Sequence, residues 1–226
     1  MSLITNLISY WEMENGNDSH GANHLSATPT VTYPAGKVNN CFHIPYNNTG
    51  RLYIANGDQT GLDCNGKSYS LSFWAYFQWA WRFYPLIKTN TWSIYNTNDY
   101  LRFWSIGETG GSHLLASTTT GITAAWHHWV LTYDYTTKQK LIYYDNINKG
   151  DAIATHGNNV GQNSNDFEFG GTTDTANRAG WMDEFGFWDR VLTPAEVTTL
   201  YNSGNGMSYN TMLTLNIINS AMKIRS

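Results

Sequence analysis

Strict alternation of side-chain type in two nine-residue segments restricts this chain to β structure. In residues 69–77, serines and two aromatic rings occupy one face, and the other face carries Tyr69, Leu71, Phe73, Ala75 and Phe77. Residues 126–134 alternate in the same way. Side chains of a β-strand point alternately to opposite faces. Both segments are therefore predicted to be long strands, and the short turn at residues 135–137 predicts a hairpin with residues 138–144.

Shorter strand-like segments separated by turn-forming residues lie at 7–13, 38–44, 51–55, 84–88, 91–95, 100–105, 113–117 and 167–171. Many short strands with one short helix indicate an all-β fold, an antiparallel two-sheet sandwich. No repeat, linker or change of composition indicates a second domain. Residues 1–206 are therefore predicted to form one domain. Residues 207–226 form an apolar C-terminal tail, predicted to add an edge strand or to extend toward the rest of a larger protein.

The single predicted helix follows a strand with an acidic pair, Asp183-Glu184. Thr193 is placed as its N-cap, Pro194 as its first residue and Glu196 as the partner that closes a capping box. Gly204 is placed where a left-handed residue ends a helix. Buried carboxylates are unfavourable unless they are paired, hydrogen-bonded or bound to a metal. The acidic pair is therefore predicted to be a folding device or part of a cation site.

The charge balance excludes two classes of partner. Charged residues make up 13% of the chain and the net charge is -4, without a basic run, so nucleic-acid binding is not expected. No apolar run reaches the length of a membrane span. The N-terminus lacks the pattern of a signal peptide. Two interpretations are open: the N-terminus has been trimmed, or the protein leaves the cell by another route, for example on a phage particle. A surface rich in Asn, Thr, Ser and Tyr suits an extracellular or virion-surface protein that binds neutral partners.

Several segments together resemble a known family. The run Met182-Asp183-Glu184-Phe185, followed by Leu192-Thr193 and Leu200-Tyr201, resembles the closing signature of LamG-like jelly-roll domains, which belong to the concanavalin A-like lectin/glucanase group. Residues 7–14, 69–74 and 126–130 resemble the same family and occur in its order, so that the resemblance covers about residues 7 to 204. The resemblance implies a jelly-roll topology. It does not fix a function, because this fold carries many functions.

Members of the resembled family often carry a calcium ion between the opening loop and the closing strand. Residues 14–24 are dense in oxygen-bearing side chains, the ligands that calcium prefers. The resemblance implies a structural Ca2+ site with Asp18 and Asp183 as its main side-chain ligands, Asn15 and Asn23 as weaker ones, and the carbonyl of His20. Under the alternative interpretation, Asp18 makes an Asx turn and the acidic pair caps backbone amides.

Ten Trp and fifteen Tyr exceed what a core of this size needs, which indicates an aromatic platform for sugar rings. The candidate ligand-binding residues are Trp79, Trp81, Arg82, Trp92, Tyr95, Tyr100 and Trp104. The alternative is packing within the core or on a sheet face, because aromatic residues are good strand formers. Trp11, Trp74, Trp126 and Trp188 lie inside the strand motifs and are assigned to structure.

Catalysis is not expected. Glycoside hydrolysis usually uses two carboxylates on opposite sides of the scissile bond, and the alternating Glu/Asp strand motif of the glucanases of this fold is absent. His127 and His128 are adjacent, so in a strand they cannot hold one metal together. His128 is predicted to be a hydrogen-bonded structural residue.

Cys41 and Cys64 could form one disulfide, but the favoured interpretation is a pair of buried free thiols.

The sequence as a whole predicts a non-catalytic, calcium-stabilised carbohydrate-binding module whose partner is a glycan or polysaccharide. The first alternative is a structural or adhesion domain of a phage or other particle, which would favour an oligomer. The second alternative is a glycoside hydrolase or lyase.

Overall fold

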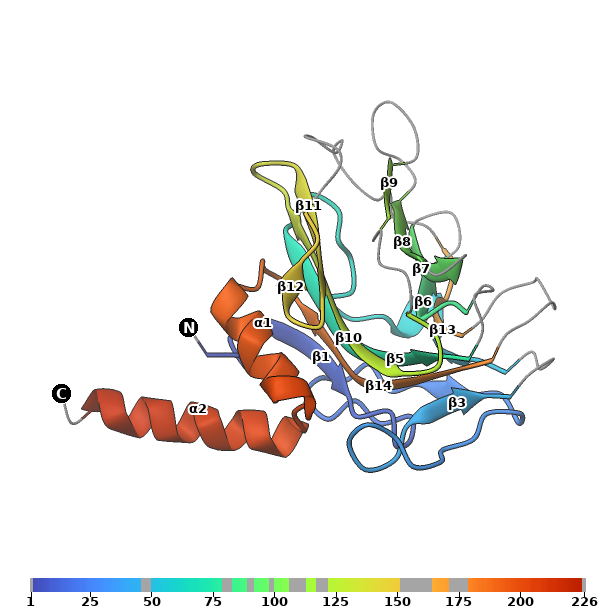
Figure 1. Ribbon diagram of the computed structural model, residues 1–226, viewed down its shortest axis with the longest axis horizontal. Helices are drawn as coiled ribbons and strands as arrows, with labels where there is room; N and C mark the ends of the chain where they lie inside the picture. Colours follow the sequence, from blue (N-terminus) through green and yellow to red (C-terminus); the bar gives the residue numbers. More distant parts are fainter. Residues whose placement is uncertain are drawn as a thin grey trace.

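The computed structural model describes residues 2–45, 50–78, 83–88, 92–97, 100–105, 113–116, 122–150, 164–170 and 179–224. Their strands form two antiparallel sheets that pack face to face, with two helices on one side (Figure 1). The predicted two-sheet antiparallel sandwich is confirmed.

Sheet A has the strand order β1 (Leu7–Trp11), β14 (Gly180–Trp188), β5 (Tyr69–Phe77), β10 (Trp126–Asp134), β11 (Gln139–Tyr144) and β12 (Ile147–Asn148), and β3 (Phe42–Ile44) pairs with β14. Sheet B has the order β2 (Ser26–Ala27), β4 (Leu52–Ile54), β13 (Phe167–Phe169), β6 (Leu86–Lys88), β7 (Trp92–Thr97), β8 (Tyr100–Ser105) and β9 (His113–Ala116). The predicted hairpin is present as β10–β11.

The alternation read from the sequence decides which residues fill the space between the sheets. Tyr69, Leu71 and Phe73 of β5 lie in the central core with Trp129 and Leu131 of β10. The intervening residues of both strands point to the outer face of sheet A. Cys41 and Cys64 are buried free thiols, as predicted.

Helix α1 (Pro194–Tyr201) covers part of that outer face. Val197 and Leu200 pack there in a second apolar cluster with Tyr10, Val130 and Trp188. The predicted capping box is confirmed, because the Thr193 hydroxyl accepts the Glu196 N–H while the Glu196 carboxylate accepts the Thr193 N–H. The helix ends earlier than predicted. Asn202 already has a left-handed φ of 49°, a short 3-10 turn (Asn202–Gly204) follows, and Gly204 is also left-handed at 86°.

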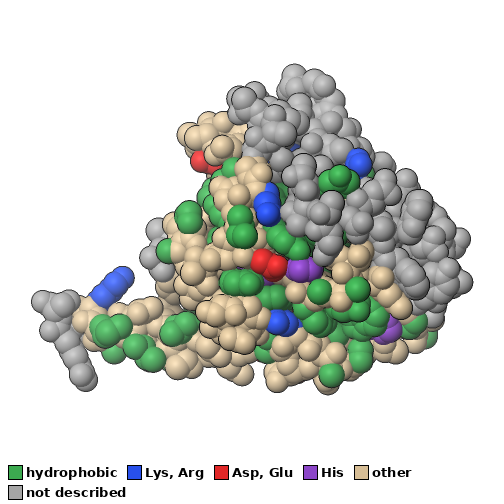
Figure 2. All heavy atoms as spheres, viewed as in Figure 1, with side chains coloured by type: hydrophobic (Ala, Val, Ile, Leu, Met, Phe, Trp, Pro, Cys, Tyr) green, Lys and Arg blue, Asp and Glu red, His purple; other side chains and the backbone are tan. Residues whose placement is uncertain are grey.

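The C-terminal tail is not an edge strand but a second helix, α2 (Tyr209–Ile224), so the prediction of a single helix was wrong. The edge strand was one of two alternatives, both based on the apolar residues of the tail, such as Leu213, Leu215, Ile217 and Ile218. In the structure Met212 and Leu215 share one side of a helix and contact the second apolar cluster. The far half of α2 extends beyond the sandwich, and Figure 2 shows hydrophobic side chains exposed along it. Among the described residues, neither helix is long and apolar enough to cross a membrane.

Candidate ligand-binding site

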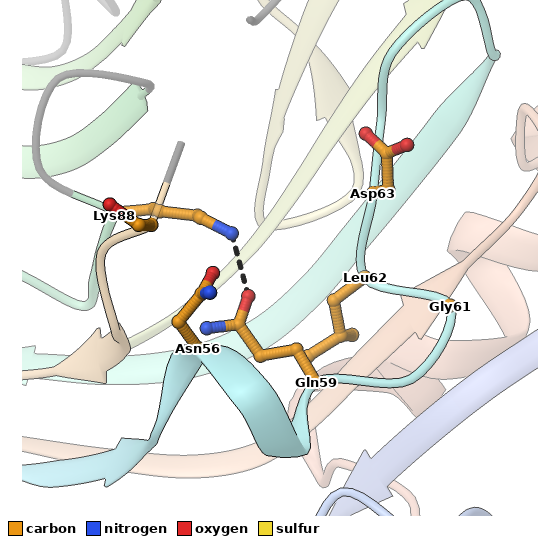
Figure 3. A pocket seen from close by; sticks show the side chains of 7 residues that line it. Asn56, Gln59, Gly61, Leu62, Asp63 and Lys88 are labelled. Carbon is orange, nitrogen blue, oxygen red and sulfur yellow. Dashed lines mark hydrogen bonds between the residues drawn. The ribbon is translucent and has the colours of Figure 1, made fainter. Parts of the chain in front are cut away.

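A polar cavity of about 540 Å³ opens at the end of β6, beside the short 3-10 helix η1 (Asn56–Asp58) (Figure 3). The described residues that line it are Asn56, Gln59, Gly61, Leu62, Asp63, Lys88 and Ser164. Lys88 is directed inward by strand alternation, because Leu86, two residues earlier in β6, is fully buried in the core. A core-facing position therefore carries a lysine, and the residue as a whole is only 7% exposed.

Hydrogen bonds hold one wall of this cavity in a fixed orientation. The Gln59 amide nitrogen donates to the carbonyls of Ile54 at 3.3 Å and Asn165 at 3.1 Å. Its oxygen is therefore turned to accept from Lys88 Nζ at 2.6 Å (Figure 3). The backbone N–H of Asn56 donates to Asp166 Oδ1 at 3.2 Å, which ties η1 to the segment before β13.

The charges around the cavity balance each other. Burial lowers the pKa of the Lys88 ammonium, and the nearby carboxylate of Asp63 acts in the opposite direction. An ammonium has three N–H groups, and the bond to Gln59 uses one of them. The cavity thus presents ammonium and amide donors, carboxylate, amide and hydroxyl acceptors, and the apolar surface of Leu62. This mixture suits an uncharged ligand with several hydroxyl groups.

The cavity does not resemble the site of a glycoside hydrolase. Asp63 is the one carboxylate among its described lining residues. A hydrolase of the usual type needs a pair of carboxylates, one on each side of the bond that breaks. The described lining contains no such pair.

The predicted aromatic platform is described only in part. Trp79, Trp81 and Arg82 lie outside the described residues, and the side chains of Trp92 and Trp104 do as well. The strand register places Trp92 of β7 opposite Lys88 of β6. The backbone position of Trp92, which was predicted to bind a ligand, is therefore adjacent to that of the cavity lysine. Two further predicted residues, Tyr95 and Tyr100, are half-buried in β7 and β8.

Asp18 organises the loop after β1 through backbone hydrogen bonds. Oδ1 accepts the N–H groups of Tyr10 at 3.0 Å, His20 at 3.0 Å and Gly21 at 2.9 Å, and Oδ2 accepts the N–H of Asn23 at 3.1 Å. A carboxylate offers about four acceptor positions, two on each oxygen, so Oδ1 is fully engaged and Oδ2 keeps one position. These are the bonds of the Asx-turn interpretation. In this conformation only Oδ2 of Asp18 could offer a lone pair to a metal.

The other loop residues predicted as calcium ligands also make hydrogen bonds within the protein. The amide of Asn23 donates to Ser9 Oγ at 2.7 Å and the Thr60 carbonyl at 2.8 Å, and accepts the Thr60 N–H at 2.7 Å. Asn15 is exposed, and its amide oxygen accepts the Asn17 N–H at 2.7 Å. His20 Nδ1 lies 2.8 Å from the Tyr209 hydroxyl.

Asp183 and Glu184 occupy a β-bulge of β14, where the register with β5 shifts. Oδ2 of Asp183 accepts the N–H groups of Lys37 and Val38, both at 2.8 Å. Its Oδ1 and both carboxylate oxygens of Glu184 are buried and make no hydrogen bond in the described part of the chain. The Tyr10 hydroxyl is close enough to lower the pKa of Glu184, but it donates its hydrogen bond to the Met207 carbonyl. Burial, which is the largest cause, raises the pKa of Asp183 to about 8 and that of Glu184 to about 9. The pair therefore has carboxylate oxygens without any hydrogen bond, whereas both oxygens of Asp18 accept at least one.

A calcium site stays a prediction. Among the described residues, no group of three or more His, Cys, Asp or Glu side chains is arranged to hold a metal ion. The free oxygens of Asp183 and Glu184 fit part of the oxygen-rich shell that calcium requires, and backbone carbonyls would have to complete it.

The lining of the polar cavity was not predicted. Lys88, Gln59, Asn56 and Asp63 form no local motif, because the cavity joins segments that are far apart in the sequence. One signal was available: in the pattern Leu86-Ile87-Lys88 the lysine shares a face with a core leucine.

Residues 47–198 match the family model Laminin_G_3, described as the concanavalin A-like lectin/glucanases superfamily. The matched range is more than half of the chain. It runs from just before β4 into α1 and includes η1 and Lys88. Comparison with curated protein sequences gives no match.

Several solved structures share the fold. The binding domain of Paraclostridial Mosquitocidal Protein 1 superposes with a TM-score of 0.71 at 15% identity, over 89% of this chain and 53% of that one. Domain 4 of AbnA, a GH43 extracellular arabinanase from Geobacillus stearothermophilus, solved with arabinotriose, has a TM-score of 0.68 at 17% identity, over 89% and 98%. A botulinum neurotoxin type C structure, concerned with cell entry through two ganglioside molecules, has a TM-score of 0.67 at 17% identity, over 89% and 52%.

This chain thus spans about half of the matched toxin chains and nearly all of the arabinanase domain. At these identities the likeness shows a common fold.

Proposed function

Because the chain belongs to the concanavalin A-like lectin/glucanases superfamily, we propose that it is a non-catalytic module that binds an oligosaccharide or polysaccharide. The observation that carries this proposal is the polar cavity, where Lys88, hydrogen-bonded to the fixed Gln59 amide, lines the same space as Asp63 and Asn56. Two similar folds concern carbohydrate ligands, arabinotriose in one and ganglioside in the other, which supports the class of ligand.

Within the cavity each group has a defined part in binding. Lys88 donates to a ring or hydroxyl oxygen, and Asp63 accepts from a hydroxyl on the other side. Asn56 can do either, and Leu62 contacts an apolar C–H face. An uncharged sugar leaves the balance between the ammonium and the carboxylate unchanged, so its binding requires no additional counter-charge.

The test is titration of a panel of uncharged polysaccharides, namely linear arabinan, xylan, mannan and β-1,3-glucan, by calorimetry and affinity electrophoresis. Lys88→Met removes the donor and keeps a chain of similar length. We expect it to weaken binding of the recognised polysaccharide at least tenfold, since a hydrogen bond to a charged group contributes about 1.5–3 kcal/mol. Lys67→Met, on an exposed loop residue, is the matched control.

Two results would contradict the proposal: no binding of any polysaccharide by the wild-type protein, or equal binding by the Lys88→Met variant. A reducing-sugar assay on the same panel tests the non-catalytic part, for which no release of sugar is expected. Thermal unfolding of both variants separates a loss of binding from a loss of fold.

A second candidate function is that of a structural or adhesion domain of a phage or other particle, at a virion or other extracellular surface. The observation that favours it is the exposed apolar surface of α2, where Ile217, Ile218 and Met222 are 67%, 49% and 58% exposed. Burial of such a surface in an assembly of copies would be favourable. Light scattering of the wild-type protein distinguishes an oligomer from a monomer.

We also propose that a calcium ion stabilises the domain at the bulge of β14. The support is the set of buried, unpartnered oxygens of Asp183 and Glu184. A bound hard cation would compensate the two carboxylates and so stabilise their charged forms.

A further inference from the structure

Four rings form a row across four adjacent strands on the outer face of sheet A. Trp126 of β10 lies opposite Tyr76 of β5 in the strand register. Trp181 of β14 lies opposite Tyr76 on one side and opposite His43 of β3 on the other. All four side chains are half-buried. Adjacent strands are about 4.8 Å apart, so the row extends for about 14 Å perpendicular to the strands.

The row lies beyond the part of the sheet that α1 covers. Tyr201, the last residue of α1, stacks on Trp74 with ring centroids 5.9 Å apart and lies 6.0 Å from the ring of His128. Tyr76 is two residues further along β5 than Trp74 and on the same face. The outer face is therefore closed by the helix as far as Trp74, and the aromatic row begins where the helix ends.

The rings enclose a hollow. The planes of Trp126 and Trp181 make angles of 64° and 84° with the ring of Tyr76, at centroid distances of 6.1 Å and 4.9 Å. Two steep indole surfaces thus flank Tyr76. The hollow between them has a volume of about 210 Å³ and is lined by Ala35, Tyr76, Trp126 and Trp181.

One wall of the hollow is held in place from behind. His43 stacks on Trp181 with centroids 4.3 Å apart and planes only 9° from parallel. Nδ1 of His43 lies 3.0 Å from the Thr32 hydroxyl, which fixes the orientation of the imidazole. The Trp181 side chain is therefore held in place before binding. A ligand that enters the hollow does not lose free energy by ordering this side chain.

The chemistry of the hollow selects an uncharged ligand with apolar faces. No charged side chain is among its described lining residues. Burial lowers the pKa of His43, which keeps its imidazole neutral near pH 7. Sugar rings have apolar C–H faces that pack on indoles, while their hydroxyls can hydrogen-bond with Tyr hydroxyl and Trp N–H groups. A stable protein partner would instead need about 800 Å² on each side, far more than a hollow that takes one ring-sized group.

From this arrangement we propose that the row of Trp126, Tyr76, Trp181 and His43 is a second glycan site. It holds one sugar ring of an uncharged polysaccharide between Trp126 and Trp181, and the chain runs across the strands along the row. The inference rests on the proposed carbohydrate-binding function but uses different residues from the polar cavity. It also assigns a ligand-binding role to Trp126, whose place in a strand motif had indicated a structural one.

The test uses the full chain and the same four polysaccharides, with affinity electrophoresis and quenching of tryptophan fluorescence as readouts. Trp181→Ala removes one wall of the hollow. Ala35→Trp fills the hollow from an exposed position without removing a ring, so it remains informative if Trp181→Ala folds poorly. Tyr135→Ala, an exposed aromatic residue in the β10–β11 turn, is the matched control.

The expected result is at least tenfold weaker binding by Trp181→Ala and by Ala35→Trp, with wild-type binding by Tyr135→Ala. If Ala35→Trp and Trp181→Ala bind as the wild type does while Lys88→Met does not, the second site is overturned and the proposed function stands. If the wild-type protein binds none of the four polysaccharides, the proposed function and the second site both fall. A dimer that dissociates on Ala35→Trp substitution would show that the row contacts another copy of the chain, and would overturn the proposal.

Discussion

His127 and His128 are adjacent in the sequence but have different partners on opposite faces of sheet A. His127 Nδ1 lies 2.7 Å from Asp145 Oδ2, and its Nε2 lies 3.2 Å from the Tyr144 hydroxyl. His128 Nε2 lies 2.9 Å from the Ser72 hydroxyl, beneath α1. Strand alternation predicted that these rings cannot share a metal, and the hydrogen-bonded structural role predicted for His128 agrees with its position.

The burial of His128 predicts a loss of stability in acid. Burial lowers its pKa to about 3, although Asp145 acts in the opposite direction. The unfolded chain binds a proton near pH 6.5 and the folded chain does not, so this contribution is present above pH 6.5 and is lost as the pH falls toward 3. Urea titrations at pH 7 and pH 5 measure how much the free energy of unfolding decreases over this pH range. We expect this decrease to be about 2 kcal/mol smaller in His128→Gln than in the wild type.

The same titrations on Gln139→Asn, at an exposed residue of β11 without a titratable group, provide the control and should reproduce the wild-type difference between the two pH values. Equal pH dependence of His128→Gln and the wild type would show that His128 is protonated in the folded state.

At the scale of elements, the two halves of α2 differ in their burial. The first half docks on the body: Met212 is 1% exposed, and the ring of Tyr209 lies 5.6 Å from that of Tyr10. The second half carries exposed Ile217, Ile218 and Met222. An isolated helix of this length is marginal in water, so contacts of the first half keep the whole helix in place.

Two methionines of α2 give a matched test of that division. Met212→Ala should lower the free energy of unfolding by about 2 kcal/mol or more, because it removes a buried side chain from the second apolar cluster. Met222→Ala changes a side chain that is 58% exposed and should have an effect below about 0.5 kcal/mol. Urea unfolding measures both. Similar effects of the two substitutions would indicate that the second half is also covered, as in an oligomer.

At the scale of the whole molecule, the first and last parts of the chain form one layer. β1 pairs with β14, the Trp188 indole donates to the Leu3 carbonyl at 2.7 Å, and the Tyr10 hydroxyl donates to the Met207 carbonyl at 2.9 Å. Asp183 adds a further link through the backbone of Lys37 and Val38. A cation at the bulge of β14 would therefore stabilise the contact between segments that are far apart in the sequence.

Calcium should accordingly raise the melting temperature, and a chelator should lower it. The raised pKa values of Asp183 and Glu184, about 8 and 9, mean that the metal-free folded state keeps protons that the unfolded state releases above about pH 4, so its stability falls as the pH rises toward 9. A cation binds the deprotonated pair, so the calcium-dependent shift should be larger at pH 9 than at pH 6.

The double variant Asp183→Asn, Glu184→Gln should lose this shift, whereas Asp58→Asn, on the exposed 3-10 helix, should keep it. Melting curves that coincide with and without calcium at both pH values would contradict the proposed calcium site.

Local patterns were sufficient to predict the longer strands, the capped start of α1 and the family, but not the two-residue strands β2 and β12. Alternation in residues 69–77 and 126–134 identified the two strands and the inward faces that the structure shows. The tail, predicted to be an edge strand or an extension from its apolar residues, forms the helix α2. The contact of Met212 and Leu215 with the body, which favours a helix, cannot be seen locally.

The sequence by itself determined which residues turn inward, because alternation and capping depend on neighbours along the chain. The tertiary structure alone decided which residues of different strands stand side by side. His43, Tyr76, Trp126 and Trp181 come from four distant segments, and the described lining of the polar cavity comes from three, residues 56–63, 88 and 164. Strand register brings the four rings together, and register is fixed by packing between segments that are remote in the sequence, so no local pattern records it.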